Sequence, residues 1–253
     1  MTEDGAPSAM AEGVAPLSCR LIKEYGVVHL KGALSDAEQL ALMRAIAGDV
    51  VTRPATNPIP ANFHISSGEL GGPTRKQPMH ELGVLLYRRF ADEVGKQLTP
   101  EDWETEHALQ RLAKVHSGEQ PAQVDQVTGV SYLTHSVLDN HQDGPFPLFT
   151  MSVAIGHACD FVVGQKPAVK AGRKWSNLRC GAPVTLLMES GDAIFFDGGS
   201  VPHAVPRVHK SNAPAWYQKA ARTGFPARIS VLFREPYGPS AAATRKNMVG
   251  VPS

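Results

Sequence analysis

The sequence predicts an α+β protein, mainly β, in which helices come first and an antiparallel double-sheet structure follows. Three observations lead to this prediction. Two segments before residue 100 carry apolar residues at helical spacing. From about residue 126, short apolar runs lie between turn signals, as in strands joined by tight connections. The chain also has 23 glycines and 20 prolines in 253 residues, which is high for a helical bundle.

The chain begins with a predicted tail, then a strand and a helix. Residues 1–17 are rich in Ala, Gly and Pro, which predicts a flexible tail. The apolar run 27–30 predicts a strand. Ser35 is suited to a helix N-cap and Glu38 stands three residues later, which predicts a capping box. Apolar residues at helical spacing extend this helix to about residue 48.

Residues 52–79 contain eight prolines and glycines and predict a mostly irregular stretch. Such a stretch is either a lid over a binding site or a surface loop packed on the sheet. A second helix is predicted over about 79–97. The strands predicted after it cover residues 127–133, 149–155, 160–163, 185–188, 193–196 and 228–233.

Composition narrows the class of protein. Hydrophobic residues make up 42% of the chain, enough for one sizeable core. A net charge of +1 excludes a strongly basic nucleic-acid-binding arm. No apolar run is long enough to span a membrane, and the N-terminus lacks the features of an export or transit signal. Because the three cysteines form no disulfide framework, we expect an intracellular protein, cytoplasmic or nuclear.

A candidate metal site is divided between two segments. His141 and Asp143 are two residues apart, so in a strand their side chains project to the same side. His203 follows later in the chain. Two histidines and one carboxylate form the ligand set of non-haem Fe(II) oxygenases, which leaves positions open for a co-substrate and O2. The His-x-Asp pair alone is a weak signal, since most such pairs are surface residues.

Two arginines, Arg228 and Arg234, stand at the two ends of a strand pattern. They are an even number of residues apart, so both side chains face the same side of the strand, and the residues between them alternate with an apolar face. Two inward-facing guanidiniums require anionic partners. A dicarboxylate such as 2-oxoglutarate supplies two carboxylates that forked guanidiniums can grip. The alternative is an edge strand with two solvated arginines.

Taken in order, five features resemble the AlkB family of Fe(II)/2-oxoglutarate dioxygenases: Tyr132, His141-Gln142-Asp143, Gly191-Asp192, His203 and Arg228-x5-Arg234. The resemblance covers most of residues 20–236, and the segment 50–120 only loosely. It implies a double-stranded β-helix (jelly roll) core with N-terminal helices packed on one sheet. The implied domain covers residues 18–236, with helices and a lid in 18–125, the core in 126–236, and a C-terminal tail in 237–253.

The resemblance also implies a role for each of these residues. Arg228 corresponds to the partner of the distal carboxylate of 2-oxoglutarate, and Arg234 to the arginine near its iron-bound end. Tyr132 corresponds to a tyrosine that hydrogen-bonds 2-oxoglutarate, although a packed aromatic is the alternative. The implied cofactors are Fe(II), 2-oxoglutarate and O2. The implied iron ligands are His141, Asp143 and His203.

The chain departs from the family at two positions. Val130 stands where the family often has an asparagine that contacts 2-oxoglutarate, so this contact is absent. Pro145 stands where bacterial members have an acidic residue that helps to recognise the damaged base. The departures leave the iron chemistry supported and put base recognition in doubt.

Basic residues gather in one part of the chain. Residues 165–234 contain eleven basic and three acidic residues, a net +8, which leaves −7 for the remainder. They cluster in 166–179, with Trp175, and in 207–222, with Trp216 and Tyr217. Basic loops with aromatics suit a phosphate backbone and stacked bases. Solvated loops with partly buried aromatics are the alternative.

These features together predict an enzyme that oxidatively demethylates N-methylated bases in DNA or RNA. One alternative is the same cofactor chemistry on a protein, lipid or small-molecule substrate, which Pro145 and the near-neutral net charge favour. A second is a binding protein with a degenerate site, against which the intact triad argues. No membrane partner is expected, and nothing in the sequence indicates an oligomeric state.

Overall fold

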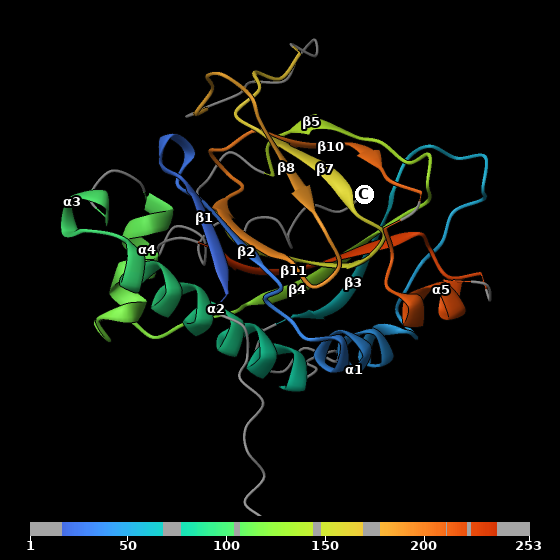
Figure 1. Ribbon diagram of the computed structural model, residues 1–253, viewed down its shortest axis with the longest axis horizontal. Helices are drawn as coiled ribbons and strands as arrows, with labels where there is room; N and C mark the ends of the chain where they lie inside the picture. Colours follow the sequence, from blue (N-terminus) through green and yellow to red (C-terminus); the bar gives the residue numbers. More distant parts are fainter. Residues whose placement is uncertain are drawn as a thin grey trace, which may run out of the picture.

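The computed structural model describes residues 17–67, 77–103, 107–143, 148–168, 178–210, 212–221 and 224–236. The predicted tails lie outside these residues, except for Leu17. Pro145 also lies outside them. Two antiparallel β-sheets face each other across an apolar interior (Figure 1). This arrangement confirms the predicted double-sheet class.

The larger sheet has seven strands in the order β1-β2-β9-β6-β11-β4-β3. In that order the strands are β1 (Ser18–Ile22), β2 (Val27–Lys31), β9 (Ala193–Asp197), β6 (Leu148–Gly156), β11 (Arg228–Pro236), β4 (Gln126–Tyr132) and β3 (Ala61–Ser67). The smaller sheet consists of β5 (Leu138–His141), β10 (His203–Val208), β7 (Cys159–Val163) and β8 (Val184–Met188). Every pairing between neighbouring strands is antiparallel.

Helices cover the outer face of the seven-stranded sheet (Figure 1). They are α1 (Asp36–Ile46), α2 (Gln77–Gln97) and α4 (His107–His116), with the short α3 (Pro100–Trp103) and α5 (Ala215–Ala221). The 3-10 turn η1 (Lys23–Tyr25) instead places Tyr25 in the core between the sheets. The predicted capping box is present, since Ser35 Oγ accepts from Glu38 N and Glu38 Oε2 accepts from Ser35 N. Phe90 of α2 packs against Phe195 of β9. No helix in the described ranges combines the length and apolarity needed to cross a bilayer.

Strand β11 separates the two layers by the alternation of its side chains. Ile229, Val231 and Phe233 are buried in the outer core beneath the helices. Ser230 and Leu232 face the interior between the sheets, on the side where Arg228 and Arg234 also lie. The predicted division of this strand into an apolar face and a face with two arginines is therefore confirmed.

The prediction of an irregular stretch over 52–79 is wrong for residues 61–67, which form β3. Ala61, Phe63 and Ile65 are buried at alternate positions, the period of a strand. The Phe63 ring lies so close to Gly129 of β4 that a Cβ there would come within 2.1 Å of it. Residues 52–60 form no helix or strand, as expected, and 68–76 lie outside the described residues.

Candidate active site

The two predicted histidines meet at one edge of the smaller sheet. His141 ends β5, His203 begins β10, and the two are direct partners in the strand pairing. Their ring centroids are 4.3 Å apart. Asp143 Oδ1 lies 3.6 Å from His141 Nε2 and 3.8 Å from His203 Nε2. One ligand atom from each of the three side chains lies within 4.8 Å of the others, so the triad can hold a metal ion.

Backbone carbonyls orient both imidazoles toward this point. His141 Nδ1 lies 2.8 Å from the carbonyl oxygen of Asp139, and His203 Nδ1 lies 3.0 Å from that of Val201. An Nδ1–H that donates to a carbonyl leaves the Nε2 lone pair free. A hydrogen bond of this kind is the usual support of a metal-binding histidine.

Asp143 reaches the site from a bend, because β5 ends at His141. The expectation that strand alternation brings His141 and Asp143 together is therefore wrong. The Asp143 amide donates to the Gly198 carbonyl oxygen (2.9 Å), and the Gln142 side chain donates to the carbonyl of Gly199. A Cβ on Gly198 would lie 2.3 Å from Asp143 Oδ2, so the carboxylate needs a glycine at this position.

The turn that carries Gly198 is organised by Asp197 at the end of β9. Asp197 Oδ1 accepts from the amides of Leu148 (2.8 Å) and Gly199 (3.0 Å), and Oδ2 accepts from Ser200 Oγ (2.7 Å). The Asp197 side chain is buried, so without this carboxylate its three donors would have no water molecule as an alternative acceptor. Asp197 thus fixes the conformation of residues 198–200, and the Gly198 carbonyl oxygen in this segment holds Asp143.

The electrostatics of the triad favour metal-binding protonation states. Burial opposes ionisation of Asp143, but the positive charges of protonated His203, of Arg234 and of protonated His141 hold the pKa of its carboxyl well below its usual range. Burial is also the main reason why the pKa of His203 is lowered to about 4. At neutral pH the aspartate is ionised and His203 is neutral, the forms that bind a metal ion.

A cavity of about 310 Å³ opens onto the triad between the two sheets. Arg234 borders it and connects its two sides, since Nη2 lies 3.3 Å from Asp143 Oδ1 and Nη1 donates to Thr128 Oγ1 (3.0 Å). Tyr132 is buried in the wall, and burial raises the pKa of its hydroxyl, which stays neutral. The remaining lining residues are Asn62, Val130, Leu138, Gln142, Ser152, Phe161, Phe196, Val205, Ser230 and Leu232.

Arg228 lies deeper than this lining, on the same face of β11. Its side chain is 2% exposed, and Nη1 donates to the carbonyl oxygens of His157 (2.9 Å) and Met188 (3.2 Å). Nε has no partner, and among the described residues no carboxylate pairs with this guanidinium. A buried cation without a counter-ion is costly. The arrangement fits an anionic molecule that carries a carboxylate, with a second group at the triad.

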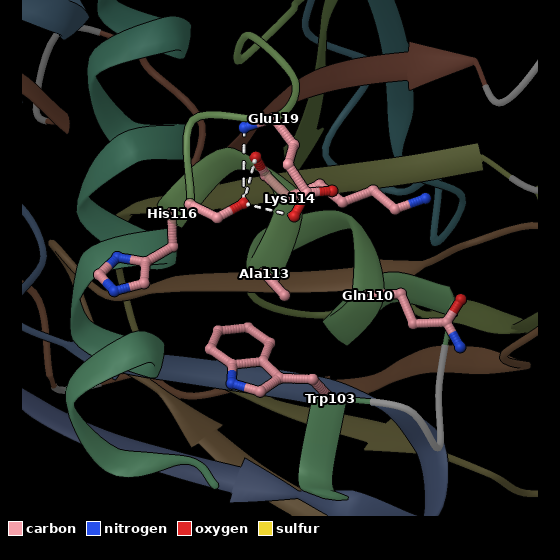
Figure 2. A pocket seen from close by; sticks show the side chains of 7 residues that line it. Trp103, Gln110, Ala113, Lys114, His116 and Glu119 are labelled. Carbon is pink, nitrogen blue, oxygen red and sulfur yellow. Dashed lines mark hydrogen bonds between the residues drawn. The ribbon is translucent and has the colours of Figure 1, made fainter. Parts of the chain in front are cut away.

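A second hollow lies on the surface of α3 and α4 (Figure 2), and among the described residues its lining contains no group that could hold a metal ion. His116 lies at its edge, stacks on Trp103 and pairs with Asp92. In the described ranges the only cluster that could hold a metal ion is the triad. The lining residues of this hollow are Trp103, Gln110, Ala113, Lys114, His116, Ser117 and Glu119.

The structure corrects part of the predicted nucleic-acid surface. Residues 215–221 form helix α5 instead of a loop, and Tyr217 is buried, with its hydroxyl donating to the Pro226 carbonyl oxygen (2.8 Å). Trp216 packs against the same core. The Tyr217 ring is therefore not free to stack on a base, and the Trp216 ring is only partly exposed. Trp175 and its neighbours 169–177 lie outside the described residues.

Three residues near the triad were not predicted as part of the site. The sequence indicates Gly198 only as a turn residue, and Asp197 either as a turn residue or as a hydrogen-bond acceptor that supports the metal ligands, with the turn role favoured. Asn62 lines the cavity from β3. The sequence signal for Asn62 was the alternation of apolar and polar residues over 61–65, but the surrounding prolines favoured an irregular stretch.

The sequence matches no protein-family model and no curated protein. The fold is similar to the structure of OsALKBH1, with 18% identity, 87% of this chain and 100% of that chain covered, and a TM-score of 0.60. An oxidoreductase of the 2OG-Fe(II) oxygenase family from Burkholderia pseudomallei has 15% identity, coverages of 84% and 85%, and a TM-score of 0.45. The non-heme alpha ketoglutarate dependent epimerase SnoN has 17% identity, coverages of 91% and 88%, and a TM-score of 0.44. The likeness to OsALKBH1 confirms the predicted jelly-roll fold with helices on one sheet.

Proposed function

We propose that the chain is an AlkB-like, Fe(II)/2-oxoglutarate-dependent dioxygenase that removes methyl groups from N-methylated bases in DNA or RNA. The observation that carries the proposal is a triad that can hold a metal ion together with the buried Arg228, which has no carboxylate partner among the described residues and lies on the same face of β11 as the cavity-lining Ser230. Residues 18–236 form the catalytic domain in this proposal.

When bound, Fe(II), 2-oxoglutarate and O2 supply the oxidation, in which one oxygen atom enters succinate as CO2 leaves and the other enters a substrate C–H bond. A hydroxymethyl group on nitrogen then breaks its C–N bond, so that formaldehyde leaves and the nitrogen recovers a proton. This chemistry requires a metal ion with open coordination positions, and a triad of only three protein ligands would leave them.

Each residue has a defined task in this proposal. His141, Asp143 and His203 hold the iron. Arg228 binds the distal carboxylate of 2-oxoglutarate, since a buried guanidinium forms short, charge-assisted hydrogen bonds to an anion. Arg234 orients the Asp143 carboxylate, as its hydrogen bond already does.

Tyr132 offers a neutral hydroxyl that can donate to the co-substrate from the cavity wall. Phe161 and Phe196 add apolar surface to the partly polar lining of the cavity.

Support for a nucleic-acid substrate comes from exposed basic residues beside the triad. The Asn140 side chain in β5 donates to the Gln165 carbonyl oxygen (2.6 Å), which places the start of the basic segment next to the strand that ends in His141. Lys166 is exposed there, and Arg207 is exposed on β10. Exposed cations on or beside the strands that carry the two histidines suit the phosphates of a nucleic-acid strand whose base enters the cavity.

The second candidate is the same cofactor chemistry on a protein, lipid or small molecule. The burial of Tyr217 favours it, because this aromatic is removed from the surface that a base would stack on.

The test uses protein purified without oxygen, then supplied with Fe(II), 2-oxoglutarate and O2. Succinate is measured with DNA and RNA oligonucleotides that carry N-methylated adenine or cytosine, and base mass is measured in parallel. Unmethylated oligonucleotides and the Asp143→Ala variant are the controls. Succinate that rises together with methyl loss supports demethylation. Succinate formation that does not change with any oligonucleotide supports the second candidate. The absence of succinate formation contradicts both candidates.

A further inference from the structure

Strand β3 brings one polar side chain into the cavity from the edge of the larger sheet. Asn62 pairs with Val130 of β4, whose side chain also lines the cavity. Asn62 is exposed, whereas Tyr132 and Ser230 at the inner end are buried. Among the described residues the Asn62 carboxamide has no hydrogen-bond partner. Asn62 therefore belongs to the solvent-exposed part of the cavity lining.

We propose that Asn62 is the specificity-determining residue of the site and that its carboxamide hydrogen-bonds the polar edge of the reacting ring of the substrate. This inference rests on the proposed function. An asparagine amide both donates and accepts, so it pairs in two-bond geometry with an edge that offers one acceptor and one donor, as adenine does.

The surroundings of Asn62 fit a flat ring with a polar edge. Val130 and Leu138 border it inside the cavity. Outside, Ile59 and Val137 are exposed, and the Val137 amide donates to the Pro58 carbonyl oxygen (2.9 Å), which joins the two loops that carry them. Apolar side chains near one amide can contact the faces of a ring and leave its polar edge to the amide.

The size of the cavity limits what can enter. A volume of about 310 Å³ is at the small end of ligand pockets, which span roughly 300–1,000 Å³. Once a co-substrate occupies the inner end, the room left suits a single ring and no larger group. A base displaced from its strand is a reacting group of this kind.

The test compares Asn62→Ala and Asn62→Asp with wild type and with the control His64→Ala. His64 is exposed on the same face of β3, two residues further along, and is not part of the cavity lining. Binding of oligonucleotides with N-methylated adenine or cytosine is measured without O2, in the presence of Mn(II) and 2-oxoglutarate. Turnover with Fe(II) and O2 is measured separately, and calorimetry gives the affinity for 2-oxoglutarate.

We expect Asn62→Ala to reduce the preference between the two methylated bases by roughly 10- to 100-fold. Asn62→Asp, which only accepts, should favour the base edge that donates. 2-Oxoglutarate affinity should stay within about twofold of wild type, and His64→Ala should keep the wild-type preference.

If Asn62→Ala keeps the preference while wild type demethylates, the inference about Asn62 is wrong and the proposed function stands. If wild type consumes 2-oxoglutarate and neither binds nor demethylates any oligonucleotide, both the nucleic-acid function and the base-reading role are wrong.

Discussion

Replacing Gly198 by alanine tests whether the turn after β9 sets the geometry of the metal site. A Cβ at this position would lie 2.3 Å from Asp143 Oδ2, whereas ordinary contact begins near 3.4 Å, so the carboxylate must move by about 1 Å. Metal–ligand distances vary by only about 0.2 Å. The displaced carboxylate therefore loses its bond to the metal, and we expect Mn(II) affinity to fall by at least about 10- to 100-fold, or 1.4 to 2.8 kcal/mol.

The matched control is Gly48→Ala, because no atom lies within 4 Å of a Cβ built there. Calorimetric titration with Mn(II) gives the affinity, and urea unfolding of the metal-free proteins gives the stability. Asp143 Oδ2 has no hydrogen bond to lose, so the free energy of unfolding of Gly198→Ala should change by less than about 2 kcal/mol. Equal Mn(II) affinity in Gly198→Ala and Gly48→Ala would refute the reasoning.

Three further predictions follow from the same site. Arg228→Met should weaken 2-oxoglutarate binding by roughly 10- to 150-fold in calorimetry and leave Mn(II) affinity unchanged, because one charged hydrogen-bonding partner is lost; unchanged 2-oxoglutarate affinity would contradict its role. Asp197→Ala should lower the free energy of unfolding by about 2–4 kcal/mol, since buried amides lose their acceptor; a loss below about 1 kcal/mol would argue against it. The pKa of His203 is about 4 in the folded protein and about 6.5 in the unfolded chain, so the unfolded chain binds the proton first as the pH falls. Between these values the metal-free protein should lose up to about 1.4 kcal/mol per pH unit from this group, and His203→Phe should flatten that slope; parallel slopes would contradict it.

The parts of the fold that sequence predicts are those with a strong local period. The alternation around Ile229 and Arg234 places an apolar layer and two arginines on opposite faces of β11, and the structure has the same division. Ser35 and Glu38 carry a complete local capping signal, and the capping box forms. The ordered triad residues are brought together as well, because they are the ends of paired strands or immediate neighbours of one.

What sequence did not predict depends on contacts between distant segments. The Asp143 amide donates to the Gly198 carbonyl oxygen, a contact that no local sequence pattern predicts. The prolines near β3 weakened its alternation, and its place at the sheet edge comes from pairing with β4 and from the fit of Phe63 on Gly129. Tyr217 stands in a basic segment, yet the turns around α5 direct it into the outer core.

The two faces of β11 have different roles, so substitutions on the two faces have different consequences. Ile229, Val231 and Phe233 belong to the helix-covered core, while Ser230 and Leu232 line the cavity and Leu232 also packs in the core between the sheets. A substitution at Ser230 therefore changes the cavity without removing an apolar side chain from either core, whereas Leu232, Val130 and Tyr132 need apolar replacements of similar volume. A library that varies the cavity positions of β11 and β4 within these limits should yield folded variants, so the site offers a starting point for evolving new substrate ranges on an unaltered scaffold.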